Sequence, residues 1–127
     1  MYEKRKLGFW KEYGWRNLSQ GLEEKNFSSR YHYIPDKKEI EYLYSGIPLV
    51  GIRRNVECIL TGEPIGSPTA FTDGEFFWTR EYLFYIENGY LALPSDFKIH
   101  MELRSYQIPS REEIGEDILD KIMYSLY

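Results

Sequence analysis

The sequence predicts a single α+β domain in which four to five helices pack on a small antiparallel sheet of about four short strands. Its length of 127 residues is typical of one domain, so we expect residues 1–127 to share one core. The strand-like segments are grouped between one helix and a run of three helices. That order favours an antiparallel sheet over alternating βαβ units. An Asp73-Gly74 pair between two such segments is a strong hairpin signal.

Near the beginning of the chain, Phe9–Tyr13 fits one helical turn, and polar residues predict a loop over Asn17–Arg30. The first longer helix is predicted over Lys37–Ser45. Asp36 before it and Glu39 in its first turn form a capping-box pattern. Gly46 follows, and we expect it to end this helix in the left-handed conformation.

Short runs rich in β-branched and aromatic residues predict the strands. The four predicted strands are Pro48–Arg53, Val56–Thr61, Thr69–Thr72 and Glu75–Trp78. Arg54-Asn55 is a candidate tight turn between the first two. The glycine- and proline-rich residues 62–68 predict a loop or corner. Asp73-Gly74 suggests a type I′ turn joining the last two strands.

Two helices are predicted after the last strand. The first covers Arg80–Asn88, with Thr79 as its N-cap and Gly89 as its stop. The second is predicted to begin at an N-cap on Ser95 and to run to about Ser105.

A third helix has the clearest pattern. Ser110 and Glu113 form a capping box at its start. Its apolar face is predicted from helical spacing of Ile114, Ile118, Leu119, Ile122, Met123 and Leu126. Its other face carries the acidic residues Glu112, Glu116, Asp117 and Asp120.

Charge and aromatic content point to protein contacts but leave alternatives. Residues 1–54 hold 11 Lys/Arg and 7 Asp/Glu, whereas residues 55–127 hold 5 and 13. The acidic half could attract a basic partner or form a solvated surface, and it would repel nucleic acid. The chain also has 12 tyrosines, 3 tryptophans and 7 phenylalanines, which suit both interfaces and a core.

The pattern of reactive side chains favours a protein that is not an enzyme and holds no metal or cofactor. His32 and His100 are the only histidines, and neither shares a metal-ligand spacing with another His or Cys. The single cysteine, Cys58, lies in an apolar run and is predicted to be buried. Asp73 is interpreted as a turn residue. With no apolar segment of membrane-spanning length and no leader-like segment, we expect the cytoplasm as its compartment.

One stretch resembles immunity proteins of contact-dependent growth inhibition systems, the CdiI-like family, and of related polymorphic toxin systems. The resemblance rests on Thr72–Trp78, on Leu83, Tyr85 and Ile86, and on Leu93–Phe97 with His100-Met101. It covers roughly Lys37–Met101. The chain departs from the family pattern at Phe76, where Trp is expected, at Thr79-Arg80, where Pro is expected, and at Phe84-Tyr85, where a tyrosine pair is expected.

This resemblance implies a protein that binds the C-terminal domain of a cognate bacterial toxin, a nuclease such as a tRNase with a basic cleft, and blocks its active site. It implies no direct contact with nucleic acid or membrane. Exposed acids and aromatics of the acidic half are the expected toxin-binding residues, namely Glu75, Glu81, Tyr82, Tyr85, Glu87, Glu116, Asp117 and Asp120. Trp78 and Phe97 are expected in the core. The alternatives are a generic protein-binding adaptor domain or a hydrolase with paired carboxylates.

Overall fold

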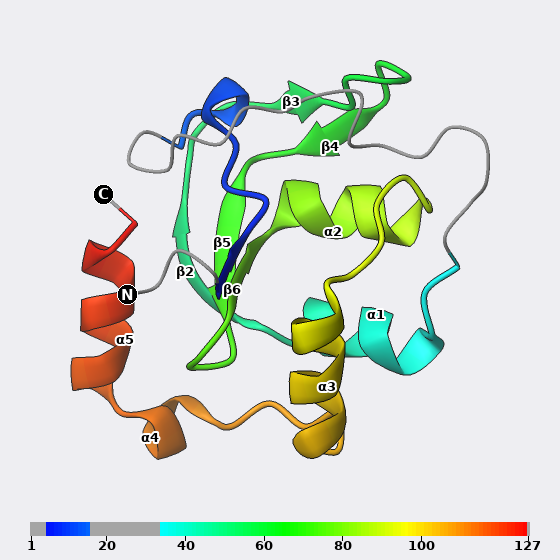
Figure 1. Cartoon of the computed structure of the whole chain (residues 1–127). Helices are drawn as coiled ribbons and strands as arrows, with labels where there is room; N and C mark the ends of the chain where they lie inside the picture. The colour runs from blue at the N-terminus through cyan, green and yellow to red at the C-terminus, as the bar shows by residue number, and fades with distance from the viewer. Residues whose placement is uncertain (1–4, 16–33, 127) are drawn as a thin grey trace.

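The α+β prediction is confirmed by a computed structural model that describes residues 5–15 and 34–126 (Figure 1). Within these residues five α-helices accompany a four-stranded sheet and a separate two-stranded one. The predicted loop over Asn17–Arg30 and the histidine His32 lie outside the described residues. Phe9–Tyr13 contains a short 3₁₀ helix over Lys11–Tyr13, which matches the predicted single turn.

The larger sheet has the strand order β1-β6-β5-β2. Its strands are β1 (Lys6–Leu7), β6 (Phe77–Thr79), β5 (Thr69–Thr72) and β2 (Ile47–Gly51). β6 pairs antiparallel with β5, as the Asp73-Gly74 hairpin signal predicted, and β2 pairs antiparallel with the other edge of β5. The sheet is antiparallel as predicted except at one edge, where β1 pairs parallel with β6. A strand of two residues is too short to leave an alternating pattern in the sequence.

The smaller sheet pairs β3 (Val56–Glu57) with β4 (Pro64–Gly66). Two predictions fail here. β3 does not return along β2 through an Arg54-Asn55 turn, and the breaker-rich residues 62–68 contain a strand. The amide of Cys58 donates to the Glu63 carbonyl over 2.8 Å, so the chain turns after β3 and comes back as β4. Proline is tolerated because β4 is an edge strand.

The β5–β6 hairpin forms at the predicted Asp73-Gly74 position, but its loop differs from a type I′ turn. The last cross-strand pair is Thr72 with Phe77, which leaves four residues in the loop. Only Gly74 has a positive φ, of 101°, whereas type I′ needs positive φ at both central residues. The Asp73 carboxylate accepts hydrogen bonds from the amides of Glu75 and Phe76 over 2.9 and 2.8 Å, so it shapes a wider loop.

The helices are α1 (Lys37–Tyr44), α2 (Arg80–Glu87), α3 (Ser95–Leu103), α4 (Arg111–Ile114) and α5 (Glu116–Tyr124). Both predicted capping boxes, Asp36 with Glu39 and Ser110 with Glu113, are present. Thr79 caps α2 as expected. The N-cap of α3 is Pro94, one residue before the predicted Ser95.

The predicted last helix is two helices. Gly115, with φ 93° and ψ 140°, lies outside the helical region and separates α4 from α5. The sequence does not reveal this break, because the capping box before Gly115 and the apolar spacing after it fit one continuous helix, and a single glycine is tolerated in a helical pattern. The break lets α5 set its own direction, and its buried face carries Leu119 and Ile122.

Gly46 serves close packing and not a left-handed helix end. The φ angle of Gly46 is not positive, and the C-cap of α1 is Ser45. A Cβ atom at Gly46 would lie 2.6 Å from the Trp78 ring and 2.8 Å from the Cβ of Phe71. A larger residue would therefore push α1 away from the sheet.

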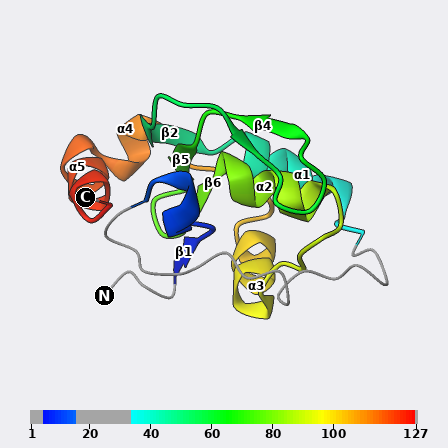
Figure 2. The ribbon, with the colours of Figure 1, turned by 90° about the horizontal axis from the view of Figure 1, so that it is seen from above.

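The core is rich in aromatic side chains that join helices to the sheet. Trp78, Tyr85 and Phe97 are fully buried, which confirms the prediction for Trp78 and Phe97, and Cys58 is buried as predicted. Helices α4 and α5 lie at one end of the molecule and α1, α2 and α3 at the other (Figures 1 and 2). The two ends therefore present separate surfaces.

Candidate functional site

The hairpin loop encloses a cluster of polar side chains centred on Asp73, which has no exposed surface. Its Oδ2 atom accepts a hydrogen bond from the Tyr42 hydroxyl of α1 and lies 2.7 Å from Nε2 of His100 on α3. Burial and the bond to Asp73 raise the pKa of Tyr42, so its hydroxyl stays protonated and acts as a donor. One carboxylate thereby ties α1, the hairpin and α3 together, a larger role than the predicted turn residue.

Glu75 and Arg104 complete this cluster at the surface. Nη2 of Arg104 donates to Glu75 over 2.7 Å, and Nη1 donates to the Asp73 carbonyl over 3.4 Å. Nδ1 of His100 lies 3.7 Å from Glu75, so both ring nitrogens of the histidine face carboxylates. Nε2 is engaged by the buried Asp73 carboxylate, whereas Nδ1 faces Glu75 beyond hydrogen-bond distance. The arrangement is that of a structural clamp.

Three of the predicted contact residues are not at the surface. Glu81 has no exposed area, and Tyr82 and Tyr85 are buried in the core. The Tyr85 hydroxyl lies 2.6 Å from that of Tyr13 and accepts the amide of Ile59 over 2.9 Å. The expectation that these residues are exposed is wrong, because α2 packs between the sheet and the N-terminal segment.

Glu81 is held by partners that are distant in the sequence. Nε1 of Trp15 donates to one of its oxygens over 2.8 Å, and the amide of Thr69 donates to the other over 3.3 Å. Burial raises the pKa of Glu81 to about 7, and the hydrogen bond from Trp15 acts in the opposite direction. Desolvation is the larger effect.

The five other predicted contact residues are exposed, and three lie on one helix. Glu116, Asp117 and Asp120 occupy the outer face of α5. Glu75 is close to this end of the molecule, because its neighbour Gly74 approaches Ile114 of α4. Glu87 lies away from α5, at the end of α2. Both of its carboxylate oxygens accept from the Tyr44 hydroxyl.

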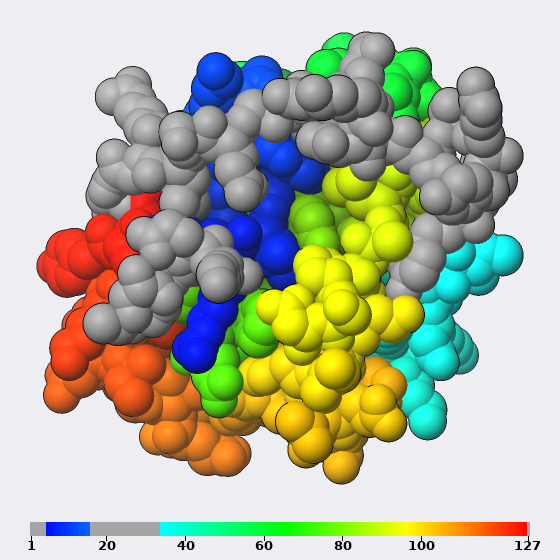
Figure 3. Space-filling model, viewed as in Figure 1, coloured from blue at the N-terminus to red at the C-terminus, as the bar shows by residue number. Residues whose placement is uncertain are grey.

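Two exposed hydrophobic side chains accompany the acids of α5. Tyr124 is 73% exposed, and helical spacing places it between Asp120 and Asp117 on the outer face. Ile118 was expected on the buried face but is 47% exposed, because it lies at the edge of the apolar stripe. The sequence analysis did not place Tyr124 among the contact residues. Its position four residues after Asp120 puts it on the same side of the helix, which is the signal that could have found it. We call Glu116, Asp117, Asp120 and Tyr124 the α5 face. Figure 3 shows that α4 and α5 lie at the surface of the molecule.

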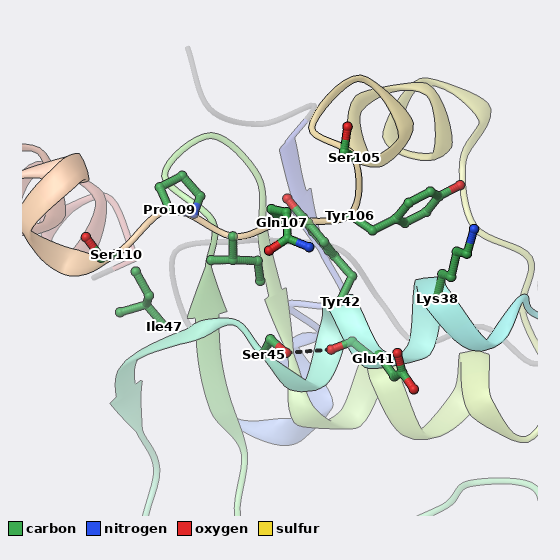
Figure 4. A pocket seen from close by; sticks show the side chains of 11 residues that line it. Lys38, Glu41, Tyr42, Ser45, Ile47, Ser105, Tyr106, Gln107, Pro109 and Ser110 are labelled. Atoms are coloured by element: carbon green, nitrogen blue, oxygen red, sulfur yellow. Dashed lines mark hydrogen bonds between the residues drawn. The ribbon is translucent and has the colours of Figure 1, made fainter.

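A groove of about 680 Å³ lies between α1 and the loop that follows α3 (Figure 4). Ser105 and Tyr106 line it with φ values of 53° and 58°, and they are the two non-glycine residues described with positive φ. The amide of Tyr106 donates to Met101 and that of Ser105 to Glu102, both over 2.9 Å, which is a Schellman motif. At the end of α2 the same motif uses Gly89.

Ser105→Gly is expected to raise the free energy of unfolding by about 1 kcal/mol, because glycine adopts the left-handed conformation without the strain of a Cβ atom. Urea denaturation of both proteins measures the difference. Ser95→Gly is the matched control, since Ser95 is exposed in the first turn of α3 and glycine is expected to lower stability there. A stability loss at both positions would contradict the strain at Ser105.

Comparison with known proteins found no matching family model, no matching curated protein and no matching solved structure. Among the described residues no helix is long and apolar enough to cross a membrane. In the same part of the chain no three His, Cys, Asp or Glu side chains are grouped as metal ligands.

Proposed function

We propose that this protein is an immunity protein that binds a cognate bacterial toxin domain through the α5 face. The observation that carries the proposal is the exposed Tyr124 set among Glu116, Asp117 and Asp120. Lys121, also exposed on this helix, and Arg111, which pairs with Glu116 over 3.5 Å, leave the surroundings of Tyr124 with an excess of acids. An exposed aromatic anchor ringed by charged side chains is typical of a protein interface. The resemblance of residues 37–101 to CdiI-like proteins supplies the class of partner.

The charge of this face fits a nuclease partner. A nuclease carries a basic cleft for phosphate groups, and an acidic surface is attracted to that cleft and speeds association. Covering the cleft would block the toxin's active site without any chemistry by the inhibitor. Such an inhibitor would act in the cytoplasm, where its contacts are with the toxin and not with nucleic acid.

The role is tested by co-expressing the chain with the C-terminal domain encoded immediately upstream of its gene. The expected result is rescue of growth and a stable complex on co-purification. If the domain is toxic and the chain neither restores growth nor binds the domain, the result contradicts the immunity role and favours a protein-binding adaptor.

Replacing Glu116, Asp117 and Asp120 with lysine together is expected to slow association with that toxin domain at least about tenfold at low salt, because steering is lost. Stopped-flow mixing gives the rate constant. The matched control reverses the exposed acids Glu57, Glu63 and Glu102, which changes the net charge equally. Equal slowing by both triple variants would show that overall charge acts and not the α5 face.

Glu116 and Asp117 lie in the first turn of α5, where acids also stabilise the helix by about 0.3–1 kcal/mol each. Circular dichroism therefore accompanies the rate measurement, and Asp120→Lys alone provides a variant outside that turn.

Tyr124→Ala is expected to raise the rate of dissociation from the toxin domain, because it removes a contact formed only in the complex.

A further inference from the structure

A second groove, of about 330 Å³, lies between α1 and α2 and is separate from the α5 face. We call it the α1–α2 groove. Leu43 and Leu83 are buried at its base, and Phe71 and Phe84 are half-buried along it. Tyr44, which is 61% exposed, stands at its side with its hydroxyl bonded to Glu87 at 2.9 Å. The lining is thus mostly apolar, and its exposed aromatic wall is held in place.

One cation lies in this apolar groove. Arg80 is exposed, and its guanidinium forms no hydrogen bond or ion pair with any residue in the described part of the chain. Its guanidinium lies beside Gly66, where a Cβ atom would come within 3.5 Å of Nη1. Burial raises the pKa of both Glu81 and Tyr44, and the nearby charge of Arg80 acts in the opposite direction on each.

The position of Arg80 is not explained by helix stability. It is the first residue of α2, where the helix dipole favours an acid and disfavours a cation. Glu87, at the last residue of α2, is likewise opposite to what the dipole favours. Both residues line the groove, but Glu87 already binds the Tyr44 hydroxyl there. The charge of Arg80 has no such partner in the described part of the chain, which points to a ligand.

We propose that the α1–α2 groove binds a segment of a partner protein in which an aromatic or aliphatic side chain stands next to a carboxylate. The apolar side chain enters between Tyr44 and Phe84, and the carboxylate pairs with Arg80. Planar guanidinium groups bind carboxylates through two parallel hydrogen bonds, and apolar surroundings strengthen that pairing. This surface selects an acidic partner segment, so it is independent of the toxin contact proposed for the acidic α5 face.

Three dipeptide probes test the two halves of this recognition. Acetyl-Phe-Asp-amide carries both groups, acetyl-Phe-Asn-amide lacks only the charge, and acetyl-Gly-Asp-amide lacks only the ring. They are titrated into the full ¹⁵N-labelled chain, and amide and arginine Nε resonances are followed. The first probe is expected to bind in the millimolar range, with shifts at Tyr44, Leu83, Phe84 and the Nε of Arg80. The Asn probe is expected to bind about tenfold more weakly, and the Gly probe with no measurable saturation.

Arg80→Gln isolates the guanidinium, and Arg53→Gln, at an exposed arginine outside the groove, is its matched control. In Arg80→Gln the Asp and Asn probes are expected to bind equally, whereas Arg53→Gln keeps the tenfold preference. The dispersion of the spectra shows that both variants are folded. Tyr44→Ala is expected to weaken both Phe probes alike, because it removes the apolar contact and leaves the charge.

Several results would overturn the proposal. One is equal affinity of the Asp and Asn probes for the unmodified chain, and another is a preference that survives Arg80→Gln. Shifts confined to the groove beside Ser105 and Tyr106 would place binding elsewhere. Phenylacetate binding as tightly as acetyl-Phe-Asp-amide would assign the groove to small aryl acids and not to a protein segment.

Discussion

Replacing Asp73 with alanine is expected to lower the free energy of unfolding by about 3–5 kcal/mol, the cost of removing one partner from a buried charged network. The carboxylate accepts bonds from Tyr42 and from two loop amides, and it faces His100. Alanine would leave these donors buried and unsatisfied. Chemical denaturation monitored by tryptophan fluorescence measures the loss, and it gives a lower limit if the variant is already partly unfolded.

Glu75→Ala is the matched control in the same loop. Glu75 bonds to Arg104 at 2.7 Å, but its side chain is 49% exposed, so the expected loss is below about 1 kcal/mol. Asp73→Asn keeps an oxygen for the loop amides and loses the charge, and we expect an intermediate result. Similar losses for Glu75→Ala and Asp73→Ala would contradict the central place of Asp73 in the clamp.

The second large expected effect is a pH dependence of stability that originates at Glu81. The pKa of Glu81 is about 7 in the folded chain, whereas its ordinary value is 4.5. Between these pH values the folded state therefore binds more protons than the unfolded state. Stability from this group is therefore present below about pH 4.5 and is lost as the pH rises through about 7. The loss between pH 5 and pH 8 is expected to be about 2–3 kcal/mol.

Glu81→Gln isolates this contribution. The difference in unfolding free energy between the unmodified chain and the variant is measured by urea denaturation at pH 5 and pH 8. We expect the difference to shift by about 2–3 kcal/mol in favour of the variant at the higher pH. Glu87→Gln, which removes an exposed carboxyl from the same helix, is the matched control. A constant difference for Glu81→Gln would show that the carboxyl is ionised in the folded state throughout this range.

Much of the fold could be predicted because its signals are local. The capping boxes at Asp36 and Ser110 and the Thr79 cap depend on residues three positions apart, and all three are present. The pairing of β1 with β6 could not be predicted, because two residues carry no periodicity and their partner lies 71 residues away. Gly46 shows the same limit: its size is required by the Trp78 ring, which the local pattern does not reveal.

The candidate site was predictable only where exposure follows from helical spacing. Asp117 and Asp120 lie opposite the apolar stripe of α5, and both are exposed as expected. Glu81 looks like an ordinary first-turn acid, and its burial depends on Trp15 and Thr69. Arg80 gives no signal in the sequence, since its position beside an apolar groove depends on α1 and β4 packing against α2.

The parallel pairing of β1 with β6 affects how the chain folds during synthesis. The ribosome adds roughly 5–20 residues per second, and Lys6-Leu7 has no strand partner until Phe77–Thr79 has left the exit tunnel. The nascent chain thus exposes the aromatic residues Phe9, Trp10 and Tyr13 for several seconds, since their burial depends on residues translated later. Chaperones that bind exposed aromatic segments would meet this protein first at the segment that follows β1.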